Sequence, residues 1–167
     1  SVVASPAETT TYTLTAVGDS TPNATAQITV GVDVEAMPLL LNEFVADNKN
    51  GLTDADGDHE DWIEIHNPNP FAIELGGWSL TDNPLRPNRW EFPSRNVHAG
   101  EYMIVFASGK NGAFDASFRL ASAGEYLALI NPDNEVVSEF APTYPVQFNG
   151  VSYGIPSGGR APAFLNP

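Results

Sequence analysis

Short runs of strand-forming residues recur along the whole chain, and turn residues separate them. Apolar and polar positions alternate with period two in several runs, and a strand places alternate side chains on opposite faces. The pattern therefore predicts an all-β fold, a β-sandwich with an N-terminal β-hairpin and no helix, because spread Gly and Pro disfavour long helices. The expected strands are residues 10–17, 24–32, 39–46, 61–67, 71–75, 78–82, 89–92, 102–107, 125–131, 136–140 and 151–153.

Two of these runs indicate how the core is built. Ile63 and Ile65 share one face of their run, so we expect both side chains in the core. Residues 102–106 and 126–130 are apolar at nearly every position. Such runs are typical of strands that are buried on both faces, so both are predicted to be central strands.

Composition changes near Pro38. All three Trp and all nine Phe follow this residue, whereas residues 1–36 are rich in Thr and Ala. We therefore expect residues 1–36 to be a hairpin with a linker and residues 37–167 to be a β-sandwich. Two strands alone are marginally stable in water, so the hairpin is either the tail of a preceding domain or packs on the main body.

Charge and composition exclude several functions. Seven Lys and Arg face 21 Asp and Glu, a net charge of −14, so no basic face can bind nucleic acid and anionic membranes are disfavoured. No apolar run approaches the roughly 18 residues of a membrane span. Without Cys there is no disulfide, thiol catalysis or thiolate metal site. An acidic, Cys-free chain rich in Thr, Asn and Asp that opens at Ser1 predicts a mature or excised piece of a secreted or cell-surface bacterial protein.

The sharpest local signal is an acidic segment that begins at Asp54. Calcium prefers roughly six to eight oxygen ligands, and alternating Asp residues on a loop converge on one point. The spacing opens like a helix-loop-helix calcium loop but departs from it, since Gly57 is fourth and Ile65 twelfth. We expect a calcium site here, and a solvated acidic turn is the alternative. The proposed ligands are Asp54, Asp56, Asp58 and Asp61, with Glu60 as a substitute for Asp61.

Other chemistry has weaker signals. His59 beside the acids suggests a transition-metal ligand, although a loop His is usually just solvated. The sequence has no nucleophile motif and no phosphate-binding loop, so no enzyme activity is predicted. Exposed aromatic residues would form a flat strip for sugar rings, although Trp90 and Phe92 alternate with charged residues and are expected to face inward. The candidates for this strip are Trp62, Trp78, Trp90 and Tyr153.

Several strand motifs resemble a known family. Asp61-Trp62-Ile63-Glu64-Ile65-His66-Asn67 and Leu75-Gly76-Gly77-Trp78-Ser79-Leu80-Thr81-Asp82 are similar to strands of bacterial lamin-tail domains, and the order of the further segments agrees. The resemblance implies an immunoglobulin-like β-sandwich that serves as a binding, assembly or accessory module. Residues 5–16 and 24–30 resemble the last two strands of bacterial immunoglobulin-like repeats. The further segments are residues 41–48, 102–110, 124–129 and 151–154.

Together these observations predict a non-catalytic interaction or spacer module of a large secreted or envelope-associated bacterial protein, stabilised by calcium. Its partner would be an unknown protein or a cell-surface component, with no nucleic acid and no membrane insertion. The alternative is a carbohydrate-binding accessory module of a secreted hydrolase.

Overall fold

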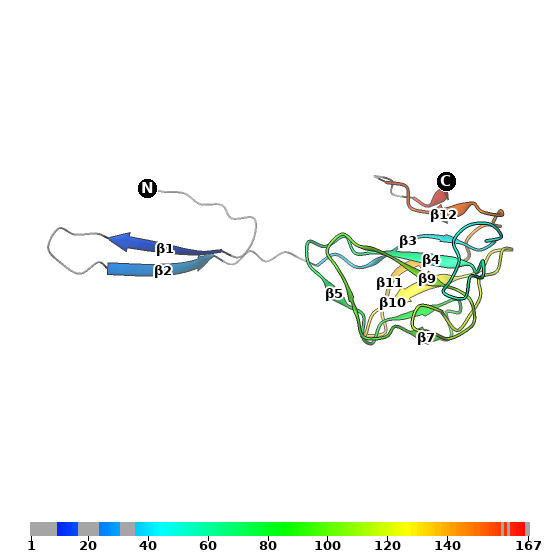
Figure 1. The fold of residues 1–167 in the computed structure, drawn as a ribbon, viewed down its shortest axis with the longest axis horizontal. Coiled ribbons are helices and arrows are strands. Elements are labelled where there is room, and N and C mark those ends of the chain that lie inside the picture. Colours follow the sequence, from blue (N-terminus) through cyan, green and yellow to red (C-terminus); the bar gives the residue numbers. More distant parts are fainter. Residues whose placement is uncertain (1–9, 17–23, 31–35, 158, 160, 166–167) are drawn as a thin grey trace. The chain divides into compact units, whose positions relative to one another are not determined.

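The computed structural model describes residues 10–16, 24–30, 36–157, 159 and 161–165, and these parts contain β-strands but no α-helix (Figure 1). The chain divides into two compact units, Ser1–Ala36 and Met37–Pro167. The strands are β1 (Thr10–Ala16), β2 (Ala24–Val30), β3 (Leu40–Val45), β4 (Trp62–His66), β5 (Ile73–Glu74), β6 (Ser79–Thr81), β7 (Trp90–Glu91), β8 (Asn96–Val97), β9 (Tyr102–Phe106), β10 (Leu127–Ile130), β11 (Val136–Phe140), β12 (Ser152–Gly154) and β13 (Ala163–Leu165).

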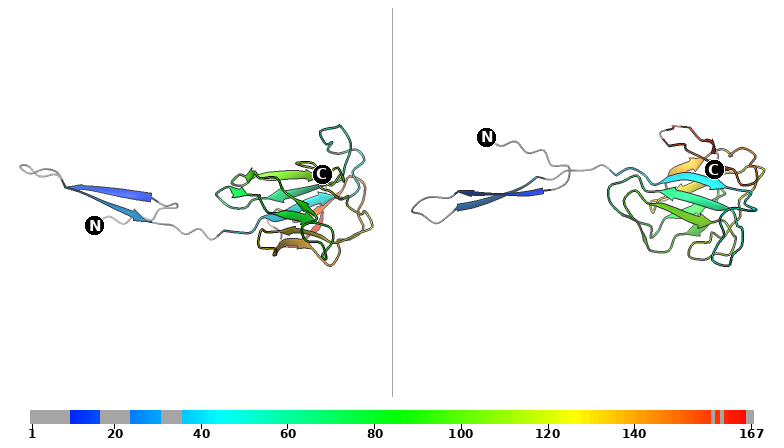
Figure 2. Two further views of the ribbon diagram at one scale, coloured as in Figure 1. Left: turned by 90° about the horizontal axis from the view of Figure 1, so that it is seen from below. Right: turned by 45° about the horizontal axis from the view of Figure 1, so that its top comes forward.

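The second unit is a sandwich of two sheets, shown as stacked layers in Figure 2. One sheet has the order β11-β10-β6-β7 and the other β13-β12-β3-β4-β9, and a short β5-β8 pair stands apart from both. The neighbouring strands are antiparallel. The expected all-β sandwich is confirmed, because each sheet turns an apolar face toward the other.

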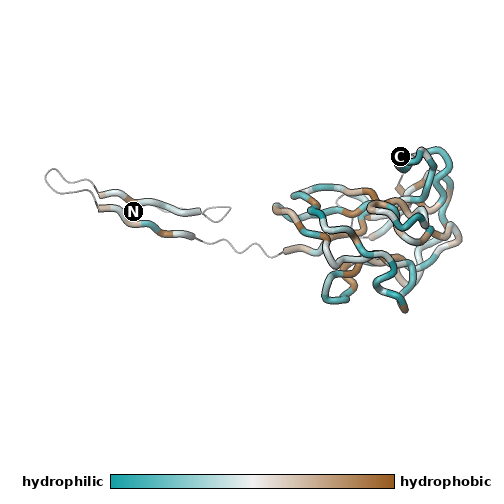
Figure 3. The backbone as a smooth tube through the Cα atoms, turned by 60° about the horizontal axis from the view of Figure 1, so that its bottom comes forward, coloured by the Kyte–Doolittle hydropathy of each residue, from teal (hydrophilic) through white to brown (hydrophobic). Residues whose placement is uncertain are grey.

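The core lies between these inner faces. Ile63 and Ile65 are both 0% exposed, so their predicted place in the core is confirmed. All residues of β10 are buried, as expected for a central strand between β11 and β6. Figure 3 shows hydrophobic and hydrophilic segments alternating along the tube of this unit, and several of its protruding segments are hydrophilic.

The prediction that residues 102–106 form a central strand is wrong. β9 is the last strand of its sheet, and Tyr102 is 56% exposed. Met103 and Val105 enter the core, so the inner face follows the expected pattern. The outer face of β9 is apolar as well, although it contacts solvent. The prediction was wrong because it took apolar residues on both faces to mean that both faces are covered.

The N-terminal hairpin pairs β1 with β2 from Thr10↔Val30 to Ala16↔Ala24, as the alternation predicted. The hydroxyls of Thr11 and Thr29 lie 2.8 Å apart across the ladder. Leu14 and Ile28 are 74% and 65% exposed, so these apolar side chains contribute little burial to the isolated unit.

Two strands, β8 and β13, were not predicted, because two or three residues are too short to show a period. β5 and β7 are also shorter than predicted, with two residues each. The other predicted strands agree with the structure to within one or two residues at most ends.

A buried asparagine fixes the end of β4. The Asn67 side chain is fully buried, and its Nδ2 donates to the carbonyl oxygens of Phe71, Val97 and His98 at 2.8, 3.0 and 3.0 Å. Its Oδ1 accepts from the main-chain and side-chain amides of Asn69 at 3.0 and 2.9 Å. One side chain thus joins β4 to the turn before β5 and to β8.

Asn69 extends this network to the start of the unit. It is 2% exposed, and its side chain exchanges two hydrogen bonds of 2.8 Å with the main chain of Met37. Buried amides need partners, so this pairing fixes the segment that leads into β3.

Candidate functional site

The acidic segment forms a compact loop just before β4. The carboxylate of Asp54 accepts hydrogen bonds from the main-chain N–H groups of Asp56 and Asp58 at 2.9 and 3.0 Å. The N–H of Asp54 donates in turn to the carbonyl of Asp58 at 2.9 Å. Gly57 has φ +87°, a left-handed conformation that Gly adopts without strain. The loop is therefore closed by its own first aspartate.

Asn48 ties this loop to the end of β3. Its Nδ2 donates to the carbonyls of Leu52 and Glu60 at 2.7 and 2.8 Å, and its Oδ1 accepts from the N–H of Gly51 at 2.8 Å. Asn48 is 6% exposed, so these bonds are shielded from water. They hold both ends of the acidic segment at one place.

A lysine ammonium occupies the point on which the aspartates converge. Lys110, from the segment after β9, places Nζ 2.5, 2.7 and 3.1 Å from carboxylate oxygens of Asp54, Asp56 and Asp58. Its hydrogen bond to Asp54 raises the pKa of Lys110, and the same bond lowers the pKa of Asp54. We call this contact the lysine clasp. Its single positive charge lies against three of the carboxylates that the sequence suggested for calcium and offsets one of their three negative charges.

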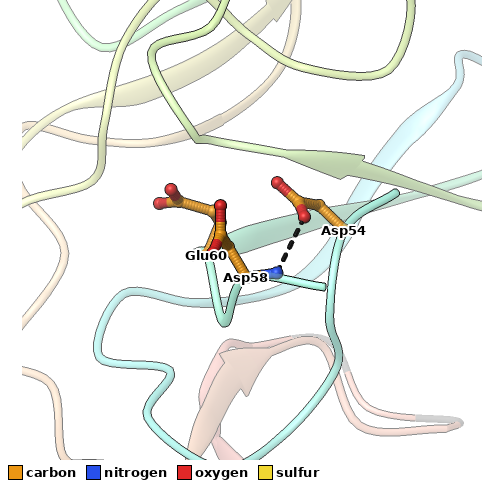
Figure 4. A group of neighbouring side chains, drawn as sticks. All are labelled: Asp54, Asp58 and Glu60. Atoms are coloured by element: carbon orange, nitrogen blue, oxygen red, sulfur yellow. Dashed lines mark hydrogen bonds between the residues drawn. The ribbon is translucent and has the colours of Figure 1, made fainter. Parts of the chain in front are cut away.

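Asp54, Asp58 and Glu60 still form a group that could hold a metal ion, since one ligand atom from each lies within 4.8 Å of the others (Figure 4). Glu60 also accepts two hydrogen bonds from the guanidinium of Arg119 at 2.6 and 3.2 Å. A metal ion at this position would compete with two side-chain cations.

Asp61 and His59 lie outside that group. Oδ1 of Asp61 accepts the main-chain N–H of Asn48 at 3.1 Å, and burial raises the pKa of Asp61 to about 6. His59 is exposed, and its Nδ1 is 3.4 Å from the carbonyl of Leu52. The structure therefore brings together Asp54, Asp56 and Asp58 around Lys110 and turns Asp61 toward β3.

The four aromatic residues suggested for a sugar strip do not lie together. Trp90 is 3% exposed and packs in the core, with its ring 4.7 Å from Phe92, so the prediction that both face inward is confirmed. Trp78 also packs against the core. Trp62 lies on the outer face of β4, and Tyr153 lines a groove elsewhere on the unit.

That groove was not predicted from the sequence. It has a volume of about 330 Å³ and combines aromatic rings with a carboxylate and a hydroxyl. Of its residues the sequence pattern indicates only Tyr153 as a ligand-binding candidate, because the others come from the end of β11, the segment after it and the segment before β13, and no motif links these parts. The lining residues are Glu139, Phe140, Ala141, Thr143, Tyr144, Tyr153 and Pro162.

The outer face of β4 and β9 is a third candidate, and we call it the outer aromatic face. The side chains of Trp62 and Phe106 are directly opposite each other, and so are those of His66 and Tyr102. The rings of His66 and Tyr102 stack with centroids 4.1 Å apart and planes at 6°. Ile104 lies between the two aromatic pairs on β9 and is partly exposed. Outer faces of antiparallel sheets are usually polar, so these apolar side chains indicate a contact surface.

Comparison with known protein families adds a further finding. Residues 35–143 match the Lamin Tail Domain, a stretch from before β3 to just after β11. The match confirms the resemblance of the strand motifs and, with the two sheets, the immunoglobulin-like β-sandwich. A search of curated proteins finds no match. Among the residues that the structure describes, no helix has the length and hydropathy to span a membrane.

Proposed function

Because the chain belongs to the lamin tail domain family, whose immunoglobulin-like domains are non-catalytic, we propose that it is an interaction or spacer module of a large secreted or envelope-associated bacterial protein. The acidic composition, rich in Thr, Asn and Asp and poor in Lys and Arg, supports a place outside the cytoplasm. The partner in this proposal is a protein or another component of the cell surface.

The observation that carries the proposal is the outer aromatic face. β9 has the composition of a strand covered on both sides, yet Tyr102 is 56% exposed and Ile104 and Phe106 are partly exposed. Exposed apolar patches on soluble domains commonly mark interaction sites. A partner that covers this face would bury the side chains that the isolated unit leaves in water.

Cosedimentation of the full chain with isolated bacterial cell envelopes tests this proposal. We expect the wild-type chain to be retained and the double variant Tyr102→Ser/Ile104→Ser to lose most of its retention. A matched control is Leu85→Ser/Val136→Ser, since these residues are 88% and 49% exposed and lie away from the outer aromatic face. Equal retention of both double variants, or no retention of the wild type, would contradict the proposal.

We also propose that calcium can replace the lysine clasp, because Ca²⁺ favours clustered carboxylates. Calcium must displace the Lys110 ammonium, so Lys110→Met should increase the rise in melting temperature that excess calcium causes relative to a chelator. Asp56→Ala/Asp58→Ala should abolish that rise. Equal melting temperatures with calcium and with chelator, in both wild type and Lys110→Met at constant ionic strength, would count against calcium.

Carbohydrate binding is a second candidate function, and the groove beside Tyr153 favours it. Sugar sites combine aromatic rings with a few polar groups, and this groove offers Phe140 and Tyr153 together with Glu139 and Thr143. Affinity electrophoresis in gels that contain soluble polysaccharides would test it. Retardation of wild type that Tyr153→Ala removes supports the groove, whereas unchanged mobility across neutral and acidic polysaccharides argues against carbohydrate binding.

A further inference from the structure

Two carboxylates lie in the cross-strand row between the two aromatic pairs of the outer aromatic face. Glu43 on β3 lies directly opposite Glu64 on β4, and Glu64 is opposite Ile104 on β9. One aromatic pair, Trp62 and Phe106, lies on one side of this row. The pair His66–Tyr102 lies on the other side, because residues two apart on a strand point to the same face.

No side-chain cation neutralises the two carboxylates within the described residues. Asn42 Nδ2 donates to Glu64 at 2.6 Å and Ser152 Oγ lies 3.1 Å from Glu43, and both of these partners are uncharged. Burial and the charge of Glu43 raise the pKa of Glu64. Burial lowers the pKa of His66 and so disfavours a positive charge on that ring. Like charges directly opposite on neighbouring strands are destabilising.

The cations of the described chain are engaged elsewhere. Ion pairs with other acids hold all of the described Lys and Arg side chains except Arg86. Arg86 lies in the turn between β6 and β7, near Asp82 on the other sheet. None of the Lys and Arg side chains that the structure describes therefore serves as the counter-ion of Glu43 and Glu64, and a basic partner would supply one.

The free edge of β9 adds a second kind of contact. Asn67 N–H donates to Glu101 O and Ala107 N–H to Asp61 O, so the odd-numbered residues of this ladder carry its hydrogen bonds. The main-chain N–H and C=O groups of Tyr102 and Ile104 consequently point away from β4. Since β9 is the last strand of its sheet, these groups can pair with an added strand.

At Phe106 the same edge is already closed. Its N–H donates to Phe114 O at 2.8 Å, and its carbonyl accepts from Ala116 N–H at 2.7 Å. The open part of the edge is therefore limited to the first half of β9, next to the stacked His66 and Tyr102 rings.

We propose that the outer aromatic face binds an extended, basic polypeptide segment. The segment adds to β9 beside Tyr102 and Ile104, and a Lys or Arg side chain reaches over the Glu43–Glu64 pair between the aromatic rows. Carboxylates and aromatic faces both attract such cations. This inference rests on the proposed interaction function and names the chemistry of the partner.

A cationic polysaccharide fits the observations less well. It would satisfy the charge of Glu43 and Glu64, but it cannot continue the main-chain hydrogen-bond ladder at Tyr102 and Ile104. A polypeptide supplies both the cation and the ladder, so the two observations together favour it.

The test uses a nine-residue peptide of alternating Thr and Lys as the probe, with the matching Thr and Glu peptide and a chitosan oligosaccharide as comparison ligands. Calorimetric titration of the full chain should show binding of the Lys peptide and none of the Glu peptide. In Glu43→Gln/Glu64→Gln, affinity for the Lys peptide should fall on the order of tenfold or more, the size expected for losing a charge-assisted contact. Hydrogen exchange should show new protection at the amides of Tyr102 and Ile104 when the Lys peptide binds.

A matched control separates this site from general attraction to an acidic chain. Glu91 is an exposed strand glutamate on the other sheet, and Glu91→Gln should leave the affinity unchanged. Equal losses in Glu91→Gln and in the Glu43/Glu64 variant, or binding of chitosan without the peptide, would overturn the inference. Wild-type retention on cell envelopes that persists in Glu43→Gln/Glu64→Gln would also overturn it while leaving the proposed function intact.

Discussion

Replacing Asn67 with alanine removes the network at the end of β4. The wild-type side chain makes five hydrogen-bond contacts within 3.0 Å while fully buried. A typical net contribution is about 1 kcal/mol per bond, and buried groups left without partners cost more. In the variant, water can hydrogen-bond to some of the carbonyls that Asn67 served, which offsets part of the loss. We therefore expect the free energy of unfolding to fall by about 3–5 kcal/mol.

Urea unfolding followed by Trp fluorescence measures this change. The slope of the free energy of unfolding against urea concentration should remain as in the wild type. In a thermal scan the loss corresponds to a melting temperature roughly 10–15 °C lower for a unit of this size. Asn96→Ala is the matched control, because Asn96 is exposed on β8, and its effect should stay within about 0.5 kcal/mol.

Asn69→Ala provides an independent check. Asn67 and Asn69 share two hydrogen bonds, so their single effects should not add in the double variant, and the coupling should be about 0.5–3 kcal/mol. A loss below about 1 kcal/mol in Asn67→Ala, or full additivity with Asn69→Ala, would refute the argument that this buried network holds β4, β5 and β8 together.

Three further predictions follow from other parts of the structure. Gly124→Ala should prevent folding or lower the melting temperature strongly in a thermal scan, because φ is +97° and the added Cβ would overlap the carbonyl oxygen of Tyr144; a melting temperature equal to wild type would contradict this. The raised pKa of Asp61, about 6, means that the folded state takes up a proton between about pH 4 and 6, so stability falls as pH rises through that range. Asp61→Asn keeps an acceptor for the Asn48 N–H and should remove this dependence of stability on pH, measured by urea unfolding at several pH values. The free energy of unfolding should rise by about 1 kcal/mol near neutral pH after solvent screening. An unchanged pH dependence would exclude Asp61 as its cause. Removing residues 1–36 should leave a cooperative melt in the remaining chain, and a broad, non-cooperative transition would show that the two units fold as one.

The sequence predicts the strands that are long enough to show a period, and it predicts Ile63 and Ile65 in the core because alternate residues of a strand share a face. It also locates the acidic loop from the density of its carboxylates. It could not predict the lysine clasp, since Lys110 lies more than 50 residues after Asp54 and only the fold brings them together. Nothing in the local pattern marks a single lysine as the counter-ion of a distant loop.

The position of β9 was missed for a different reason. Residues 102–106 are apolar on both faces, and sequence periodicity reports how much of a strand is apolar but not what covers it. The outer face of β9 contacts solvent in this structure, so the composition of Tyr102, Ile104 and Phe106 fits a covered strand better than an exposed edge. In the same way, Asn67 belongs to a strand motif of the sequence, but its structural role depends on its hydrogen bonds to residues 71, 97 and 98, which only the fold brings close.

The lysine clasp makes the acidic loop carry its own counter-ion on a covalent tether. A tethered ammonium has an effective concentration that is often in the millimolar range or above and does not change when the surrounding solution is diluted. A free divalent ion displaces the ammonium from the aspartates only when its own concentration and affinity together outweigh the effective concentration and affinity of the tethered Lys110. The shape of the loop before β4 therefore depends on whether the sandwich is folded and holds Lys110 in place, and calcium reaches these aspartates only by displacing the tethered ammonium.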